Sequence, residues 1–175
     1  DSHCHLDKID LKNFDGQFSK IVQAARAAKV EHMLCIGVTL DDFPAMREQV
    51  SEFPDVSISC GVHPLYVAKH PLDRAQLRQW AAMPEVVAIG ETGLDYFYDN
   101  ADRKIQRDVF ERQLQIAVDF ELSKFATSCH FYLSDHYHKN YPGRCFKVES
   151  VFDNLKDLKK KVKGKRREVI CKHAD

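Results

Sequence analysis

Short apolar runs alternate with longer amphipathic stretches along the first two-thirds of the chain. Three of the runs are too short for helices and end near glycine or polar residues: 33–39, 56–62 and 86–89. Continuous apolar runs of this length, with β-branched residues, are typical of strands that are buried on both faces of a parallel sheet. The pattern therefore predicts three parallel β-strands.

The segments before, between and after these runs have helical periodicity. They cover residues 14–29, 41–53, 72–83 and 102–122. In the last segment, Ile105, Val109, Ile116 and Phe120 recur at helical spacing and are expected to form the packed face. Strict alternation of strand and helix predicts βαβ units, which build either a doubly wound sheet or an α/β barrel.

Polar residues at strand ends decide between these two architectures. His63 and Glu91 each follow a predicted strand, and His3 lies in what we interpret as a short strand stub. In barrel enzymes the reacting groups gather where the strands end, so we expect an α/β fold of the TIM-barrel type. A complete barrel needs roughly 250 residues, so a chain of 175 residues is expected to form about half of one.

The regular pattern stops near residue 124. Residues 125–141 are rich in His, Tyr and Ser, and the Lys-rich stretch that follows holds nine Lys or Arg against four Asp or Glu in residues 151–175. We therefore divide the chain into residues 1–124, the N-terminal half of a hydrolase barrel, and a divergent tail, residues 125–175. The basic tail is interpreted as the solvated face of a helix, with nucleic-acid binding as the alternative.

The N-terminal segment holds a His-Cys-His triplet. Residues two apart on a strand point to the same face, so His3 and His5 can hold one metal ion between them while Cys4 faces away. Asp1 and Asp7 flank the triplet and add carboxylates that could support the imidazoles. The competing interpretation is a polar N-terminal stub.

Glu91 follows the run 86–89 directly and lies between Gly90 and Gly93. The glycines allow a tight turn that would bring this carboxylate into a cleft, where it could bind a metal ion. A turn with a solvated acid is the alternative. Asp95, in the same segment, is a candidate supporting group or general base.

His63 directly follows the run 56–62 and precedes Pro64. An imidazole at a strand end can donate to a substrate phosphate or carry protons. A structural role for this histidine is the alternative.

Taken together, the segments DSHCHLD, CGVHP and IGETGLDY resemble, in order and spacing, the signatures of the TatD family of deoxyribonucleases. The resemblance covers residues 1–124, including the helical pattern of 106–117. It implies a TIM-barrel phosphodiesterase that acts on DNA and depends on divalent metal ions. It also implies that His3, His5 and Glu91 bind metal, with Glu91 as a catalytic residue, and that His63 contacts substrate. Asp95 and Tyr96 match the motif without an assigned role.

The tail departs from that pattern. The family's later VIHxR-like, HCFSG-like and ETDAP-like motifs, which bring further metal ligands, have no counterpart here. His130 falls close to where the first of them would lie, and His136 and His138 form a second spaced pair that resembles a loop. A shifted reading frame after about Lys124 or a shortened relative of the family would explain the difference.

The leading functional hypothesis is metal-assisted hydrolysis of a phosphodiester in DNA, with Mg²⁺, Mn²⁺ or Zn²⁺ as the ion. The alternatives are a barrel metallohydrolase of the amidohydrolase kind and a non-catalytic remnant whose basic tail binds nucleic acid. The six cysteines form no CxxC pair, and no apolar run approaches membrane-spanning length, so we expect a cytoplasmic protein without a membrane partner. Open sheet edges of a half-barrel predict self-association.

Overall fold

The computed structural model of the chain describes residues 1, 3–96, 98 and 101–120. These residues form a parallel sheet of three strands, in the order β1 (Met33–Cys35), β2 (Val56–Cys60) and β3 (Val86–Ile89). The strands lie within the predicted runs, although the first two end before residues 39 and 62. Directly beyond β1, Gly37 N–H donates to the side-chain oxygen of Ser59, at 3.2 Å, rather than to a strand carbonyl.

The N-terminal stub extends the sheet beyond β1. Cys4 forms an isolated parallel bridge with Cys35. Its N–H donates to Leu34 O at 3.1 Å, and its carbonyl accepts from Ile36 N at 2.9 Å. The predicted stub is therefore strand-like at this point, and the chain turns into a short 3₁₀ helix, Leu6–Lys8, directly afterwards.

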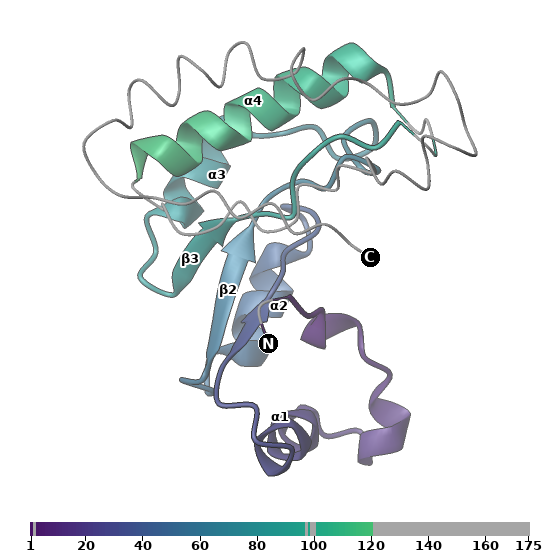
Figure 1. The fold of residues 1–175 in the computed structure, drawn as a ribbon, viewed down its shortest axis with the longest axis vertical. Helices are drawn as coiled ribbons and strands as arrows, with labels where there is room; N and C mark the ends of the chain where they lie inside the picture. Colours follow the sequence, from purple (N-terminus) through teal and green to yellow (C-terminus); the bar gives the residue numbers. More distant parts are fainter. Residues whose placement is uncertain (2, 97, 99–100, 121–175) are drawn as a thin grey trace.

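Helices alternate with the strands as the pattern predicts, with shorter bounds. They are α1 (Phe18–Ala27), α2 (Phe43–Val50), α3 (Arg74–Ala81) and α4 (Arg103–Asp119). α1 starts later than predicted because Asp15 and Gly16 have positive φ angles of 52° and 72°, which end the preceding 3₁₀ helix, Leu11–Phe14. In Figure 1, α1 lies at one end of the molecule and α4 at the other, with the sheet between them.

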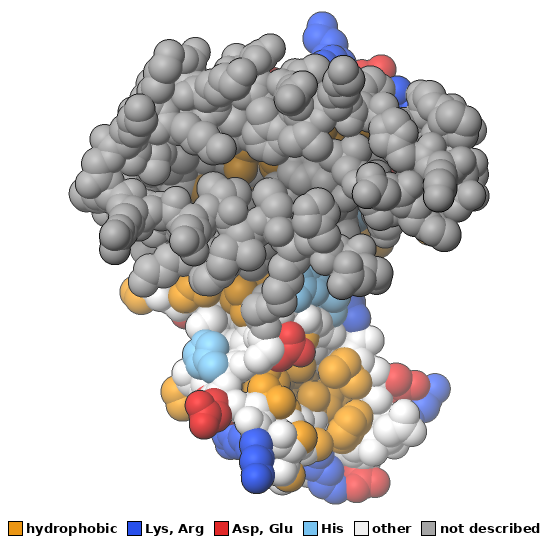
Figure 2. All heavy atoms as spheres, in the orientation of Figure 1, with side chains coloured by type: hydrophobic (Ala, Val, Ile, Leu, Met, Phe, Trp, Pro, Cys, Tyr) orange, Lys and Arg blue, Asp and Glu red, His pale blue; other side chains and the backbone are white. Residues whose placement is uncertain are grey.

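The core lies on both faces of the sheet, because the strand residues are almost all buried. Phe43 of α2 and Trp80 of α3 stack with ring centroids 4.5 Å apart, which joins these two helices over the sheet. In Figure 2, on the part of the surface that is coloured by side-chain type, charged side chains of both signs surround hydrophobic ones near α1. Among the described residues, no helix is long and apolar enough to cross a membrane.

The predicted packed face of α4 was partly wrong. Val109 and Ile116 are buried, but Ile105 is 47% exposed. Two glutamines, Gln106 and Gln113, are buried on this helix instead, with 1% and 0% exposure. A helix that packs against loops meets backbone polar groups as well as apolar side chains, and an amide can satisfy those groups where isoleucine cannot.

Candidate metal centre

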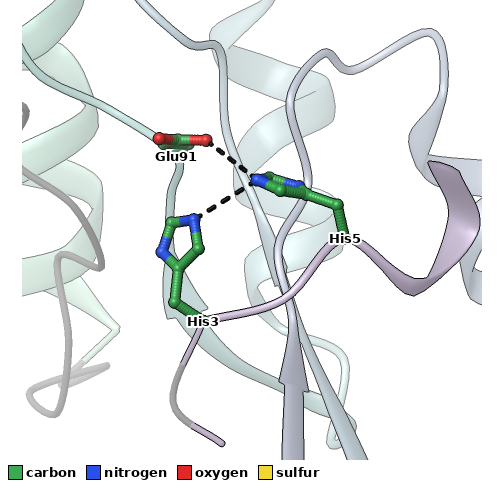
Figure 3. A group of neighbouring side chains, drawn as sticks. All are labelled: His3, His5 and Glu91. Carbon is green, nitrogen blue, oxygen red and sulfur yellow. Dashed lines mark hydrogen bonds and ion pairs between the residues drawn. The ribbon is translucent and has the colours of Figure 1, made fainter. Parts of the chain in front are cut away.

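Three side chains converge beyond the strand ends. Nε2 of His3 lies 3.3 Å from Nε2 of His5, and Nε2 of His5 lies 3.6 Å from Oε2 of Glu91. All three ligand atoms lie within 4.8 Å of one another. Figure 3 shows the three side chains pointing toward a common centre, two from the N-terminal stub and one from the segment after β3. The structure thus brings together the three residues that the sequence analysis selected as metal ligands.

The pairing of Cys4 with β1 explains the direction of the two histidines. Side chains alternate along an extended segment, so the neighbours of Cys4 share one face and Cys4 takes the other. Its Sγ donates to Leu34 O at 3.2 Å, on the side of the core. The rings of His3 and His5 meet edge to face at 82°, with centroids 5.1 Å apart. The carboxylate of Asp1 accepts from His3 N at 3.0 Å and so braces this segment.

The hydrogen bond of His5 determines which nitrogen can bind a metal ion. Nδ1 lies 3.1 Å from Ile36 O, and a carbonyl only accepts, so Nδ1 carries the hydrogen. In a neutral imidazole this leaves a lone pair on Nε2, the atom that faces His3 and Glu91. Metal-binding histidines are commonly oriented by this kind of contact.

Backbone contacts to neighbouring strand ends place Glu91. Its N–H donates to Gly37 O at 2.6 Å, and the N–H of Gly90 donates to Cys60 O at 3.0 Å. The hydroxyl of Ser59 also donates to Gly90 O at 2.8 Å. Glu91 is only 3% exposed, and a buried carboxylate is costly unless cations or hydrogen-bond donors surround it. The solvated turn that the sequence left open as an alternative is therefore wrong.

His63 approaches the other oxygen of the same carboxylate. Its Nε2 lies 3.6 Å from Oε1 of Glu91, and the residue is 7% exposed. The N–H of Leu65 donates to Nδ1 of His63 at 3.1 Å, so the neutral ring carries its hydrogen on Nε2. His63 therefore presents a donor to the centre, whereas His5 presents a lone pair.

The geometry of the three ligand atoms suits a metal ion. Two nitrogens that each lie about 2.0–2.1 Å from a tetrahedral zinc ion are about 3.3 Å apart, which equals the observed separation of the two Nε2 atoms. Two imidazoles and a carboxylate suit Zn²⁺ and also Mn²⁺ or Mg²⁺, without a sharp preference. A cation at this centre would neutralise the carboxylate and accept the lone pair of His5.

Asp95 and Asp7 take part in local contacts rather than in the convergent group. The buried carboxylate of Asp95 accepts from Tyr98 N at 3.1 Å, which holds a turn. Asp7 contacts Nζ of Lys8 at 3.2 Å. Tyr96 packs under the guanidinium of Arg103, 4.7 Å from the ring centroid.

Sequence reasoning missed the polar residues behind the site. Thr92 is fully buried, and its Oγ1 accepts from Nε2 of Gln113 at 2.7 Å. A signal was present, because Gln106 and Gln113 are two helical turns apart and so share one side of the helix. The remaining histidines that the sequence analysis considered, His130, His136 and His138, lie outside the described residues, as do the tail and its predicted boundary.

Comparison with known proteins places this geometry in context. Residues 1–125 match the family described as TatD related DNase. The chain is 40% identical over 116 residues to the uncharacterized metal-dependent hydrolase YcfH of Escherichia coli K12, covering 66% of this chain and 43% of YcfH. It is 33% identical over 118 residues to the 3'-5' ssDNA/RNA exonuclease TatD of Citrobacter rodentium, covering 67% and 45%.

A solved structure shares the fold. The crystal structure of YJJV, a TatD homolog from Escherichia coli K12, superimposes with a TM-score of 0.63 at 27% identity, covering 71% of this chain and 48% of YJJV. The described residues therefore form part of a TIM-barrel-type fold, as the strand-helix alternation and the polar residues at the strand ends predicted. The chain spans less than half the length of these three relatives.

Proposed function

Because the chain belongs to the TatD-related DNase family, we propose that it is a metal-dependent hydrolase that cleaves phosphodiester bonds in DNA. The observation that carries this proposal is the convergence of two imidazoles and a buried carboxylate at the strand ends, with a third imidazole beside them. Such a donor set suits a divalent cation, and a phosphodiester is a substrate that cation-assisted hydrolysis serves well.

In this proposal His3, His5 and Glu91 hold the ion. A divalent ion held there would lower the pKa of a bound water molecule and polarise the phosphate. In this proposal Glu91 is both a ligand and a catalytic residue, because its buried carboxylate lies 3.6 Å from Nε2 of His5 and 3.6 Å from Nε2 of His63. Ile36 O keeps the lone pair of His5 directed at the centre.

His63 contacts the substrate in this proposal. Leu65 N–H donates to Nδ1 of its ring, so Nε2 carries the hydrogen that would donate to a phosphate oxygen in this proposal. Its distance of 3.6 Å from Oε1 of Glu91 puts that donor next to the carboxylate and opposite His5. A donor that faces developing negative charge stabilises the transition state of hydrolysis.

The test is DNA cleavage by the purified chain with and without a chelator, together with metal content by equilibrium dialysis and atomic emission. His3→Ala and His5→Ala should each lose bound metal and cleavage. The matched control is His32→Ala, because His32 is exposed and bonds to Ser57 Oγ at 2.7 Å instead. Unchanged metal content in both site variants would contradict the ligand assignment.

Parallel assays separate the other hypotheses. Hydrolysis of small amides or phosphomonoesters in preference to DNA would favour the amidohydrolase kind of chemistry. DNA binding that survives the chelator, without any cleavage, would favour a non-catalytic role of the chain. The family match supports the phosphodiester substrate over both.

A further inference from the structure

The side-chain amide of Gln113 joins two segments of the site. This residue lies on α4 and is fully buried. Its Oε1 accepts from Val62 N at 2.7 Å. Its Nε2 donates to Val62 O at 3.1 Å and to Oγ1 of Thr92 at 2.7 Å. Both amide hydrogens and the amide oxygen are therefore used, so the side chain has one preferred orientation.

The partners of Gln113 are the immediate neighbours of two site residues. Val62 precedes His63, and Thr92 follows Glu91. The side chains of His63 and Glu91 face each other with 3.6 Å between Nε2 and Oε1. One amide thus joins the two segments that carry this pair.

Close packing at Gly61 adds a second constraint. A Cβ atom at this position would lie 2.8 Å from Oε1 of Gln113 and 2.8 Å from the carbonyl carbon of Gly90. Real Cβ atoms do not approach so closely, so the segment before His63, the segment before Glu91 and the amide are in direct contact. In such a contact, a shift of the amide moves both segments.

We propose that Gln113 is a positioning residue that sets the separation of His63 and Glu91, and through Glu91 the affinity of the metal centre. The expected effect on DNA cleavage rests on the proposed function. An apolar side chain of similar length leaves the buried N–H and C=O of Val62 without this partner, so the segment must shift to find another. Groups that orient metal ligands affect affinity or turnover even though they touch neither metal nor substrate.

α4 also provides a matched control. Gln106 is 1% exposed and makes the same kind of contact, with its Oε1 accepting from Asp95 N at 2.8 Å. Its Nε2 donates to the carbonyls of Asp95 and Ala101 at 2.9 and 3.0 Å. Replacing it removes the same number of hydrogen bonds from the same helix, but from Asp95 and Ala101 rather than from the immediate neighbours of His63 and Glu91.

The test compares Gln113→Met with Gln106→Met in the full chain. Thermal unfolding in chelator measures the cost to the fold, calorimetric titration measures Mn²⁺ affinity, and cleavage of a DNA oligonucleotide gives kcat and KM. Gln113→Met should lose about 10–100-fold in Mn²⁺ affinity or in kcat, while KM stays within about twofold. Gln106→Met should be destabilised to a similar degree and keep both. Equal losses in the two variants, or none in Gln113→Met, would overturn the proposal.

Two further measurements keep the proposal decidable. If Gln113→Met does not fold, Thr92→Val removes only the hydroxyl that accepts from Gln113, and it should show a smaller loss of the same kind; no loss overturns the proposal.

If the wild-type chain binds no Mn²⁺ and cleaves no DNA, the proposed function fails. Crystal structures of the metal-free variants then decide. A longer separation of His63 and Glu91 in Gln113→Met alone supports the positioning role, and an unchanged one overturns it.

Discussion

Replacing Glu91 by glutamine should remove most of the stabilisation of the protein by metal ions. The substitution keeps the shape of the side chain but exchanges a charged ligand oxygen, 3.6 Å from Nε2 of His5, for a neutral amide. Ligand binding to the folded state alone stabilises it by RT ln(1 + [L]/Kd), which is about 2.7 kcal/mol at 100 times Kd. The wild-type chain should therefore gain about this much free energy of unfolding when Mn²⁺ is added at that concentration.

The expected difference follows from the number of ligands. Glu91 supplies one of three ligand atoms and the only negative charge among them, so we expect its loss to weaken binding by about 100-fold or more. At the same metal concentration the variant then gains only about 0.4 kcal/mol. The difference of about 2.3 kcal/mol corresponds to roughly 5–9 °C in the unfolding midpoint of a chain of this size.

The assay is thermal unfolding by circular dichroism, with chelator and with Mn²⁺. Glu85→Gln is the matched control, because it makes the same chemical change at the opposite end of β3, where Glu85 pairs with Arg47 at 2.6 Å. The control should keep the full metal-induced shift. An equal shift in Glu91→Gln and the wild type would refute the assignment of Glu91 as a ligand.

Three other predictions follow from the same structure. His63→Ala should retain bound metal and lose about 10²–10⁴-fold in DNA cleavage; loss of metal, measured by atomic emission, would make His63 a ligand instead. Burial raises the pKa of the Cys60 thiol from 9.0 to about 12. At pH 8, Cys60 of the native chain should therefore react with iodoacetamide at least about 100-fold more slowly than Cys60 of the urea-unfolded chain. Equal reaction rates, measured by peptide mass spectrometry, would contradict this burial. Among the described residues β3 pairs with β2 alone, and an unpaired strand edge favours association. Light scattering after size exclusion should therefore show oligomers. A monodisperse monomer with robust metal-dependent nuclease activity would count against this half-barrel prediction.

The convergence of the three candidate ligands could be anticipated before the structure. Parallel strands present their carboxyl ends at one edge of a sheet, so polar residues that follow successive strands meet there. Glu91 follows β3 in this way, and the pairing of Cys4 with β1 puts His3 and His5 on the corresponding edge. Alternation along an extended segment is a local property, which is why the triplet alone predicted that both imidazoles share a face.

The different hydrogen positions on the imidazoles depended on contacts that the sequence does not show. His5 and His63 are the same residue type, yet Ile36 O leaves a lone pair on one ring and Leu65 N leaves a hydrogen on the other. The packed face of α4 was likewise misjudged at Ile105, because helical periodicity describes one helix and not the surface that it meets.

The sequence by itself determined the order of strands and helices, the strand-end position of Glu91 and the shared face of His3 and His5, because periodicity and motif spacing depend on neighbours along the chain. Only the tertiary structure decided that His63 faces the same carboxylate and that Gln113 joins Val62 to Thr92. These contacts link segments far apart in the sequence. The first depends on the pairing of β2 with β3 and the second on how α4 packs against the strand ends, and no local pattern records either.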